Sequence, residues 1–175
     1  MISASTRIHG VFWSEDIFEE WRRVAPREGL TSLENVVRFQ TIMNAMFQDA
    51  LIHREKYERL IDQMTNDEGD RHVLAAAVSQ GEVGVIVTHN LRHFPPDAID
   101  PFDLEVQTPD EFVRNQAELN PRNFIQVFLR RAERRNELAL NSGRNQISPH
   151  DIANFLRDGP ANMVETGNYI LELLG

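Results

Sequence analysis

The sequence predicts an α/β fold in which a mainly parallel sheet is flanked by helices. Short apolar runs suited to strands alternate with longer segments whose apolar residues recur at helical spacing, which is typical of βαβ units. From about residue 114 onward only helical patterns remain. We therefore expect one domain over residues 1–113, followed by a helical C-terminal region over residues 114–175.

The expected strands are short and lie at residues 8–12, 49–52, 83–87 and 104–107. The run over 83–87 is rich in β-branched residues, which suits a fully buried parallel strand. Thr88 and Asn90 follow this strand directly. In open α/β sheets ligands bind at the carboxyl ends of the strands, so both residues are candidates for contacting substrate. The alternative is that they only cap the turn after the strand.

Polar residues that can accept hydrogen bonds from a first helical turn mark the expected helix starts. They are Ser14, Ser32, Asn66 or Asp67, Thr108, Asn120 and Ser148. The first helix should bury Ile17, Trp21 and Val24 and end at Pro26. The second, over 33–47, has a broad apolar face whose methionines we attribute to core filling. The helix that starts at Asn66 or Asp67 should end at Gly81, and the long C-terminal helix should end at Gly143. The helix after Ser148 should bury Ile152, Phe155 and Leu156.

Composition indicates a cytoplasmic protein. The chain has no cysteine, no apolar run long enough to span a membrane and no signal-peptide pattern. Its formal net charge of -9 argues against broad electrostatic binding of nucleic acid. Lys56 is the only lysine, so almost all basic residues are arginines, whose planar fork suits phosphate groups.

Carboxylates gather at the start of the helix that begins near Asp67. Asp67 and Asp70 are separated by one helical turn and can face the same side. The positive end of the helix dipole favours their ionised form. Clustered oxygen ligands of this kind suit a hard divalent cation. Asp70 is therefore the best candidate metal ligand. Asp67 is an alternative ligand or simply the helix cap.

Three segments resemble the PIN-domain family, and most closely the VapC-type toxins of prokaryotic toxin–antitoxin pairs. They are DRHVLAAA at residues 70–77, VTHNLRHFP at 87–95 and TPDEF at 108–112. The resemblance covers roughly residues 8–113 and implies an endoribonuclease that depends on Mg²⁺ or Mn²⁺. It also implies the toxin role in a VapBC-type pair, with RNA as substrate, a cognate antitoxin that masks the acidic site, and a homodimer.

The resemblance also implies a role for a glutamate on the first helix. Glu20 lies at the family position of a metal-site glutamate, whereas Glu19 does not. Glu20 and Asp70 are thus the expected catalytic residues, and Asp70, Glu20 and Asp67 the expected metal ligands. The alternative is that both glutamates are solvated helix residues.

The sequence departs from the family pattern at two places. The usual first strand, which ends in an aspartate, has no counterpart before residue 8, and His93 stands where an aspartate is usual. We expect the gap in the sheet to be filled by another chain, closed by the strands at 8–12 and 83–87, or explained by a longer product. The alternative function is a truncated or degenerate protein that binds an antitoxin-like partner or RNA without cleaving it.

Arginines also cluster on the long helix that follows Asn120. Arg130 and Arg134 are one turn apart, and the segment from Arg122 to Arg144 carries six arginines against two glutamates. This pattern predicts a ridge that contacts RNA phosphates. The alternative is a solvated helix whose arginines pair with Glu133 and Glu137 along the same helix.

Overall fold

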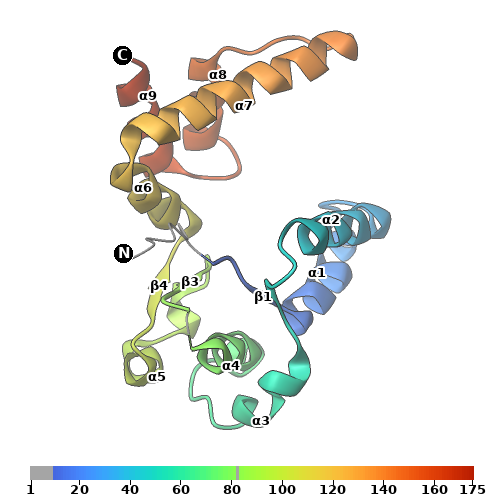
Figure 1. Ribbon diagram of the computed structural model, residues 1–175, viewed down its shortest axis with the longest axis vertical. Coiled ribbons are helices and arrows are strands. Elements are labelled where there is room, and N and C mark those ends of the chain that lie inside the picture. The colour runs from blue at the N-terminus through green and yellow to red at the C-terminus, as the bar shows by residue number, and fades with distance from the viewer. Residues whose placement is uncertain (1–9, 82) are drawn as a thin grey trace, which may run out of the picture. The chain divides into compact units, whose positions relative to one another are not determined.

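The computed structural model describes residues 10–81 and 83–175 (Figure 1). Two compact units are present. The first comprises Met1–Ile86 and Arg92–Val106, as far as its residues are described, and the second comprises Val87–Leu91 and Gln107–Gly175. The first unit contains strands as well as helices, and the second is built mainly of helices, so the α/β class is confirmed.

The elements of the first unit follow in chain order. The longer helices are α1 (Glu15–Arg27), α2 (Leu33–Met46) and α4 (Arg71–Gln80), and the shorter ones are α3 (Glu58–Ile61) and α5 (Pro96–Ile99). Strands β1 (Trp13–Ser14) and β2 (Leu51–Ile52) precede β3 (Val85–Val87) and β4 (Glu105–Gln107), whose last residues belong to the second unit. Four 3₁₀ turns connect them: η1 (Arg54–Lys56), η2 (Glu68–Asp70), η3 (Leu91–His93) and η4 (Asp100–Phe102).

The described strands form two parallel pairs rather than one continuous sheet. Strand β1 pairs with β2, with Trp13 opposite Leu51. Strand β3 pairs with β4. The Glu105 N–H donates to the Gly84 carbonyl, and the Thr88 N–H donates to the Gln107 carbonyl. These two bonds together form the pattern of a parallel pair. The parallel pairing was predicted correctly, but the single sheet was not, because neither β1 nor β2 pairs with β3 or β4 in the described structure.

The expected strand over residues 8–12 lies partly outside the described residues. Residues 8 and 9 are not described, and residues 10–12 are not in a strand; the strand begins at Trp13 instead. Within the described part of the chain, β1 and β3 do not pair with each other, so the expected closing of these two strands is not seen. Strand β3 buries only Ile86, so its expected full burial was wrong.

Helix α1 starts as predicted but ends one residue after Pro26, the predicted end. The Ser14 hydroxyl accepts from the Ile17 N–H at 3.2 Å, and the helix continues through Pro26 to Arg27. Proline has no N–H to donate to the carbonyl four residues earlier, and the helix ends one residue after it. The side of α1 that is buried differs from the predicted side, which carries Ile17, Trp21 and Val24. Phe18 and Ala25 are buried, and Phe18 stacks on Trp13 with 5.7 Å between ring centroids.

Helix α2 starts at the predicted cap, Ser32, and buries only Val36 and Gln40. Gln40 is held by the Phe18 carbonyl, to which its amide donates at 2.9 Å, and by Arg22. Core filling was wrong for Met46, whose side chain is 68% exposed, because no described element covers that side of α2. The exposed apolar residues of this helix are Leu33, Val37, Phe39, Ile42 and Met46.

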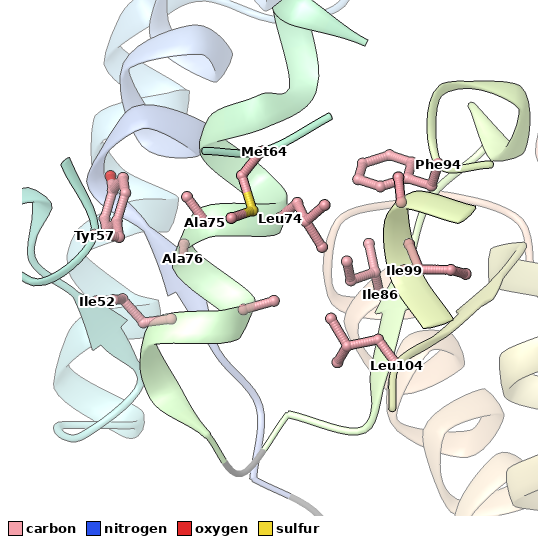
Figure 2. Packing of buried hydrophobic residues seen from close by; sticks show 12 residues of the cluster. Ile52, Tyr57, Met64, Leu74, Ala75, Ala76, Ile86, Phe94, Ile99 and Leu104 are labelled. Carbon is pink, nitrogen blue, oxygen red and sulfur yellow. The ribbon is translucent and has the colours of Figure 1, made fainter. Parts of the chain in front are cut away.

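Helix α4 is the centre of the first unit's core (Figure 2). Leu74 is fully buried and points toward Phe94 and Ile86, while Ala75 and Ala76 face Tyr57 on the other side. Small residues on that side let the helix approach the Tyr57 segment closely. Burial on both sides fixes the axial position of α4, and with it the acidic residues at the helix start.

The start and end of α4 depend on local hydrogen bonds. Asp67 caps the preceding turn η2 by accepting from the Gly69 N–H at 3.0 Å, so the α-helix proper begins at Arg71. Asn66, the other expected cap, is buried, and its side-chain atoms have no hydrogen-bond partner in the described structure. The helix ends as predicted at Gly81, which adopts a left-handed conformation with φ of 64°.

The second unit consists of α6 (Pro109–Leu119), α7 (Pro121–Asn141), α8 (Pro149–Asp158) and α9 (Val164–Leu174). The predicted caps are confirmed: Thr108 and Ser148 form capping boxes, and Asn120 accepts from the Asn123 N–H. Helices α8 and α9 pack closely where Ala153 faces Gly167. Phe155, which was expected to be inward, is 61% exposed because Ala153 occupies the contact side of α8.

A carboxylate from α6 caps α9, which has no cap of its own. Asp110 accepts from the Glu165 N–H at 2.9 Å and from the Thr166 N–H at 2.8 Å. Burial acts to raise the pKa of Asp110, but these hydrogen bonds outweigh it, so the pKa lies below its ordinary value. The ionised carboxylate therefore stabilises the folded unit.

Asp110→Asn should lower the free energy of unfolding of the second unit by about 1–2 kcal/mol at pH 7, because an amide cannot accept from both N–H groups. Since the folded-state pKa is depressed, the wild-type advantage is present above about pH 4 and is lost as the pH falls through the folded pKa. Thermal unfolding followed by circular dichroism at several pH values measures this. Glu172→Gln, an exposed residue of α9, is the control; an equal loss in both variants would contradict the role of Asp110.

Candidate metal centre

The start of α4 and the loop before α5 bring three possible metal ligands together. The Asp67 N–H donates to the His93 carbonyl at 3.1 Å, which ties the loop to turn η2. Asp70 closes that turn, with its N–H bonded to the Asp67 carbonyl at 2.9 Å. The two aspartates and His93 therefore converge through main-chain contacts, in addition to those of their side chains.

The donor atoms of the three side chains are close together. One ligand atom each from Asp67, Asp70 and His93 lies within 4.8 Å of the others. His93 Nδ1 is 2.5 Å from Asp70 Oδ2 and 3.8 Å from Asp67 Oδ1. Arg92 Nε lies 3.3 Å from His93 Nε2, which assigns the proton to Nδ1 and makes it the donor to Asp70.

This donor set fits a divalent ion. Neighbouring ligands of one ion bound at about 2.1 Å lie about 3 Å apart. The 3.8 Å pair is near that separation, and the 2.5 Å pair has to open by about half an ångström once its shared proton is gone. Asp70 and His93 are largely buried and Asp67 is half-exposed, so the site is open on one side. Asp70 and Asp67, two of the expected ligands, thus lie in one cluster of possible ligands, and their binding of a metal stays a prediction.

Glu20, the third expected ligand, lies beside His72 rather than in this cluster. Its Oε2 is 4.0 Å from His72 Nε2. It lines a pocket of about 480 Å³ in the first unit, together with Glu19, Glu68 and Gly69. The buried His72 Nδ1 has no hydrogen-bond partner in the described structure. The catalytic role of Glu20 stays a prediction.

The other expected site residues lie in the second unit. The Thr88 hydroxyl accepts from the Asn90 N–H at 3.1 Å, the arrangement expected of a turn cap. On α7, Arg134 pairs with Glu137 at 2.9 Å, as the solvated-helix alternative expects. Arg130 is exposed, and no ion pair of it is found in the described part of the chain. Contact of these four residues with RNA stays a prediction.

Sequence reasoning did not identify His93 as a partner of the aspartates. It noted the histidine as a departure from the family pattern, of a residue type that can bind Mn²⁺ or Zn²⁺ but is a poor ligand for Mg²⁺, and left open whether His93 replaces the acidic ligand. The signal that could have placed it was the motif itself, because the resemblance aligns His93 with a position that is usually acidic in the family it resembles. A histidine in place of an acid keeps a residue type that can bind a metal at that position.

No helix in the described ranges is both long and apolar enough to cross a membrane.

A comparison with known proteins finds similarity to another protein over part of the chain. Over 63 residues the chain is 49% identical to a protein of Mycobacterium tuberculosis (strain ATCC 25618 / H37Rv) named "Putative ribonuclease VapC50". The matched segment covers 36% of this chain and 37% of the relative. No family model matches the chain, and no solved structure matches it significantly. A VapC-like relationship is therefore supported for about a third of the chain.

Proposed function

We propose that this chain is a divalent-metal-dependent endoribonuclease with a PIN-like fold, acting as the toxin of a VapBC-type pair. The observation that supports this most directly is the convergence of Asp67, Asp70 and His93 at the start of α4. The segment shared with the VapC-named relative adds support. We further propose a cytoplasmic location, a cognate antitoxin that covers the acidic site, and a homodimer.

In this proposal Asp70 and Asp67 hold the ion, Mg²⁺ or Mn²⁺ by analogy with the family, and His93 holds or orients it. A bound divalent ion supplies a water of lowered pKa and neutralises charge on the phosphodiester. Glu20, which lies beside His72 of α4, accepts the proton of the attacking water. Arg130, Arg134, Thr88 and Asn90 bind the RNA chain.

The proposal is tested by incubating the metal-stripped full chain with structured RNA, before and after adding Mg²⁺ or Mn²⁺. Cleavage that appears only with metal and is lost in Asp70→Asn supports it. Cleavage that persists without metal, or in that variant, contradicts it. Binding of RNA without cleavage under all conditions favours the second candidate, a non-catalytic relative. The histidine in place of an acid and the pairing of Arg134 favour that candidate.

Glu19 and Glu20 provide a matched pair for the proposed proton acceptor. Both are exposed residues of α1 that line the same pocket, but only Glu20 contacts His72. Glu20→Gln should lower the cleavage rate at least about tenfold, the low end of what general acid–base catalysis contributes. Glu19→Gln should leave the rate within about twofold. Single-turnover cleavage rates measure both, and equal losses would assign the effect to pocket charge rather than to Glu20.

A further inference from the structure

The donor set at the start of α4 differs from the all-oxygen site that Mg²⁺ requires. We propose that this site takes a divalent transition-metal ion, binding Zn²⁺ more tightly than Mn²⁺ and Mn²⁺ more tightly than Mg²⁺. The inference rests on the proposed function in that it concerns the same site. It adds the identity of the ion that the chain's own residues select.

The first argument is the chemistry of the ligands. Two of the three donors are carboxylates, and the third is the imidazole of His93, whose Nδ1 is the atom that faces both aspartates. Mg²⁺ demands oxygen ligands in near-ideal octahedral geometry, whereas imidazole suits zinc and other transition metals. The chain has no cysteine, so imidazole is its strongest nitrogen or sulfur donor for such ions.

The second argument is that His93 is fixed in place. Its carbonyl accepts from the Asp67 N–H at 3.1 Å, and its side chain is largely buried. A mobile surface histidine could turn away and leave an oxygen-only site for Mg²⁺. The main-chain contact keeps the backbone of His93 beside both carboxylates, and the burial of the ring and its contact with Asp70 oppose its turning away.

The third argument concerns the surroundings of the two ring nitrogens of His93. An ion that binds at Nδ1 needs the neutral imidazole with its proton on Nε2. Arg92, which now donates to Nε2, is exposed and free to turn toward solvent. Arg92 therefore does not have to stay at Nε2 when an ion binds at Nδ1. The two aspartate charges then balance those of the divalent ion.

Other histidines of the described chain do not offer a comparable site. His53 contacts a single carboxylate, that of Glu15, at 2.8 Å, and both groups are exposed. His72 lies 4.0 Å from Glu20. Only Asp67, Asp70 and His93 bring three such donors within 4.8 Å in the described residues. His53 is accordingly the best control for adventitious zinc binding.

The test is isothermal titration calorimetry of the metal-stripped full chain with ZnCl₂, MnCl₂ and MgCl₂. Each step from Mg²⁺ to Mn²⁺ and from Mn²⁺ to Zn²⁺ should lower the Kd at least about tenfold. His93→Ala should weaken Zn²⁺ binding at least about tenfold, whereas His53→Ala should leave it unchanged. His93→Asp, which restores an oxygen donor, should strengthen Mg²⁺ binding and weaken Zn²⁺ binding.

Equal affinities for the three ions, or Zn²⁺ binding that survives His93→Ala, would overturn the inference. Circular dichroism of each variant shows whether it is folded. If His93→Asp does not fold, His93→Asn takes its place in the titrations. The outcome is separable from that of the proposed function. RNA cleavage supported by tightly bound Mg²⁺ would refute the ion selectivity and keep the nuclease. Selective Zn²⁺ binding without any cleavage would do the opposite.

Discussion

Asp70→Asn should lower the rate of metal-dependent RNA cleavage on the order of 100-fold or more. Loss of groups that only orient metal ligands already costs about 10–100-fold in metal affinity or activity, and we propose Asp70 as a ligand itself. The amide removes one of the two negative charges of the cluster while keeping the size of the side chain. An oxygen remains that can still accept from His93 Nδ1.

The substitution should leave the fold intact. Asp70 stands at the N-terminus of α4, but its side chain makes no capping hydrogen bond, so little helix stability depends on it. Single-turnover cleavage of structured RNA measures the effect. Asp62→Asn, an exposed aspartate after α3, is the matched control and should cleave at the wild-type rate. Loss of activity in both variants would show that general surface charge, and not the cluster, is responsible.

Helix boundaries were predictable because their causes are local. Ser14, Ser32, Thr108 and Ser148 each accept from a backbone N–H three residues ahead, a contact that the chain makes whatever surrounds it. The left-handed Gly81 is local in the same sense. Burial was less predictable, since it depends on which distant element covers a helix side. The apolar side of α2 was therefore expected to be inside and is exposed.

The candidate site also has one part that local sequence determines and one part that depends on distant contacts. Asp67 and Asp70 share a side because they are three residues apart at a helix start, which a sequence reveals directly. His93 joins them through a chain path 23 residues long that periodicity cannot trace. The sheet could not be predicted either, because pairing β1 with β2 and β3 with β4 is decided by contacts between segments far apart in sequence.

The largest stability effect is expected at Leu74, which fixes the helix that carries the candidate site. Its side chain is 0% exposed and lies at the centre of the first unit's core, one turn after Asp70 (Figure 2). Leu74→Ala should lower the free energy of unfolding of this unit by about 3–5 kcal/mol, because transfer energy is lost and a cavity remains between α4 and Phe94. That corresponds to roughly a hundredfold or greater change in the folding equilibrium constant.

Tryptophan fluorescence in a urea titration measures this effect selectively, since both tryptophans of the chain, Trp13 and Trp21, belong to the first unit. Leu33→Ala makes the same chemical change at a side chain that is 52% exposed, and should stay within about 0.5 kcal/mol of wild type. If the two variants lost equal stability, α4 would not be held by Leu74. Contacts other than those of this core would then have to hold Asp70 next to His93.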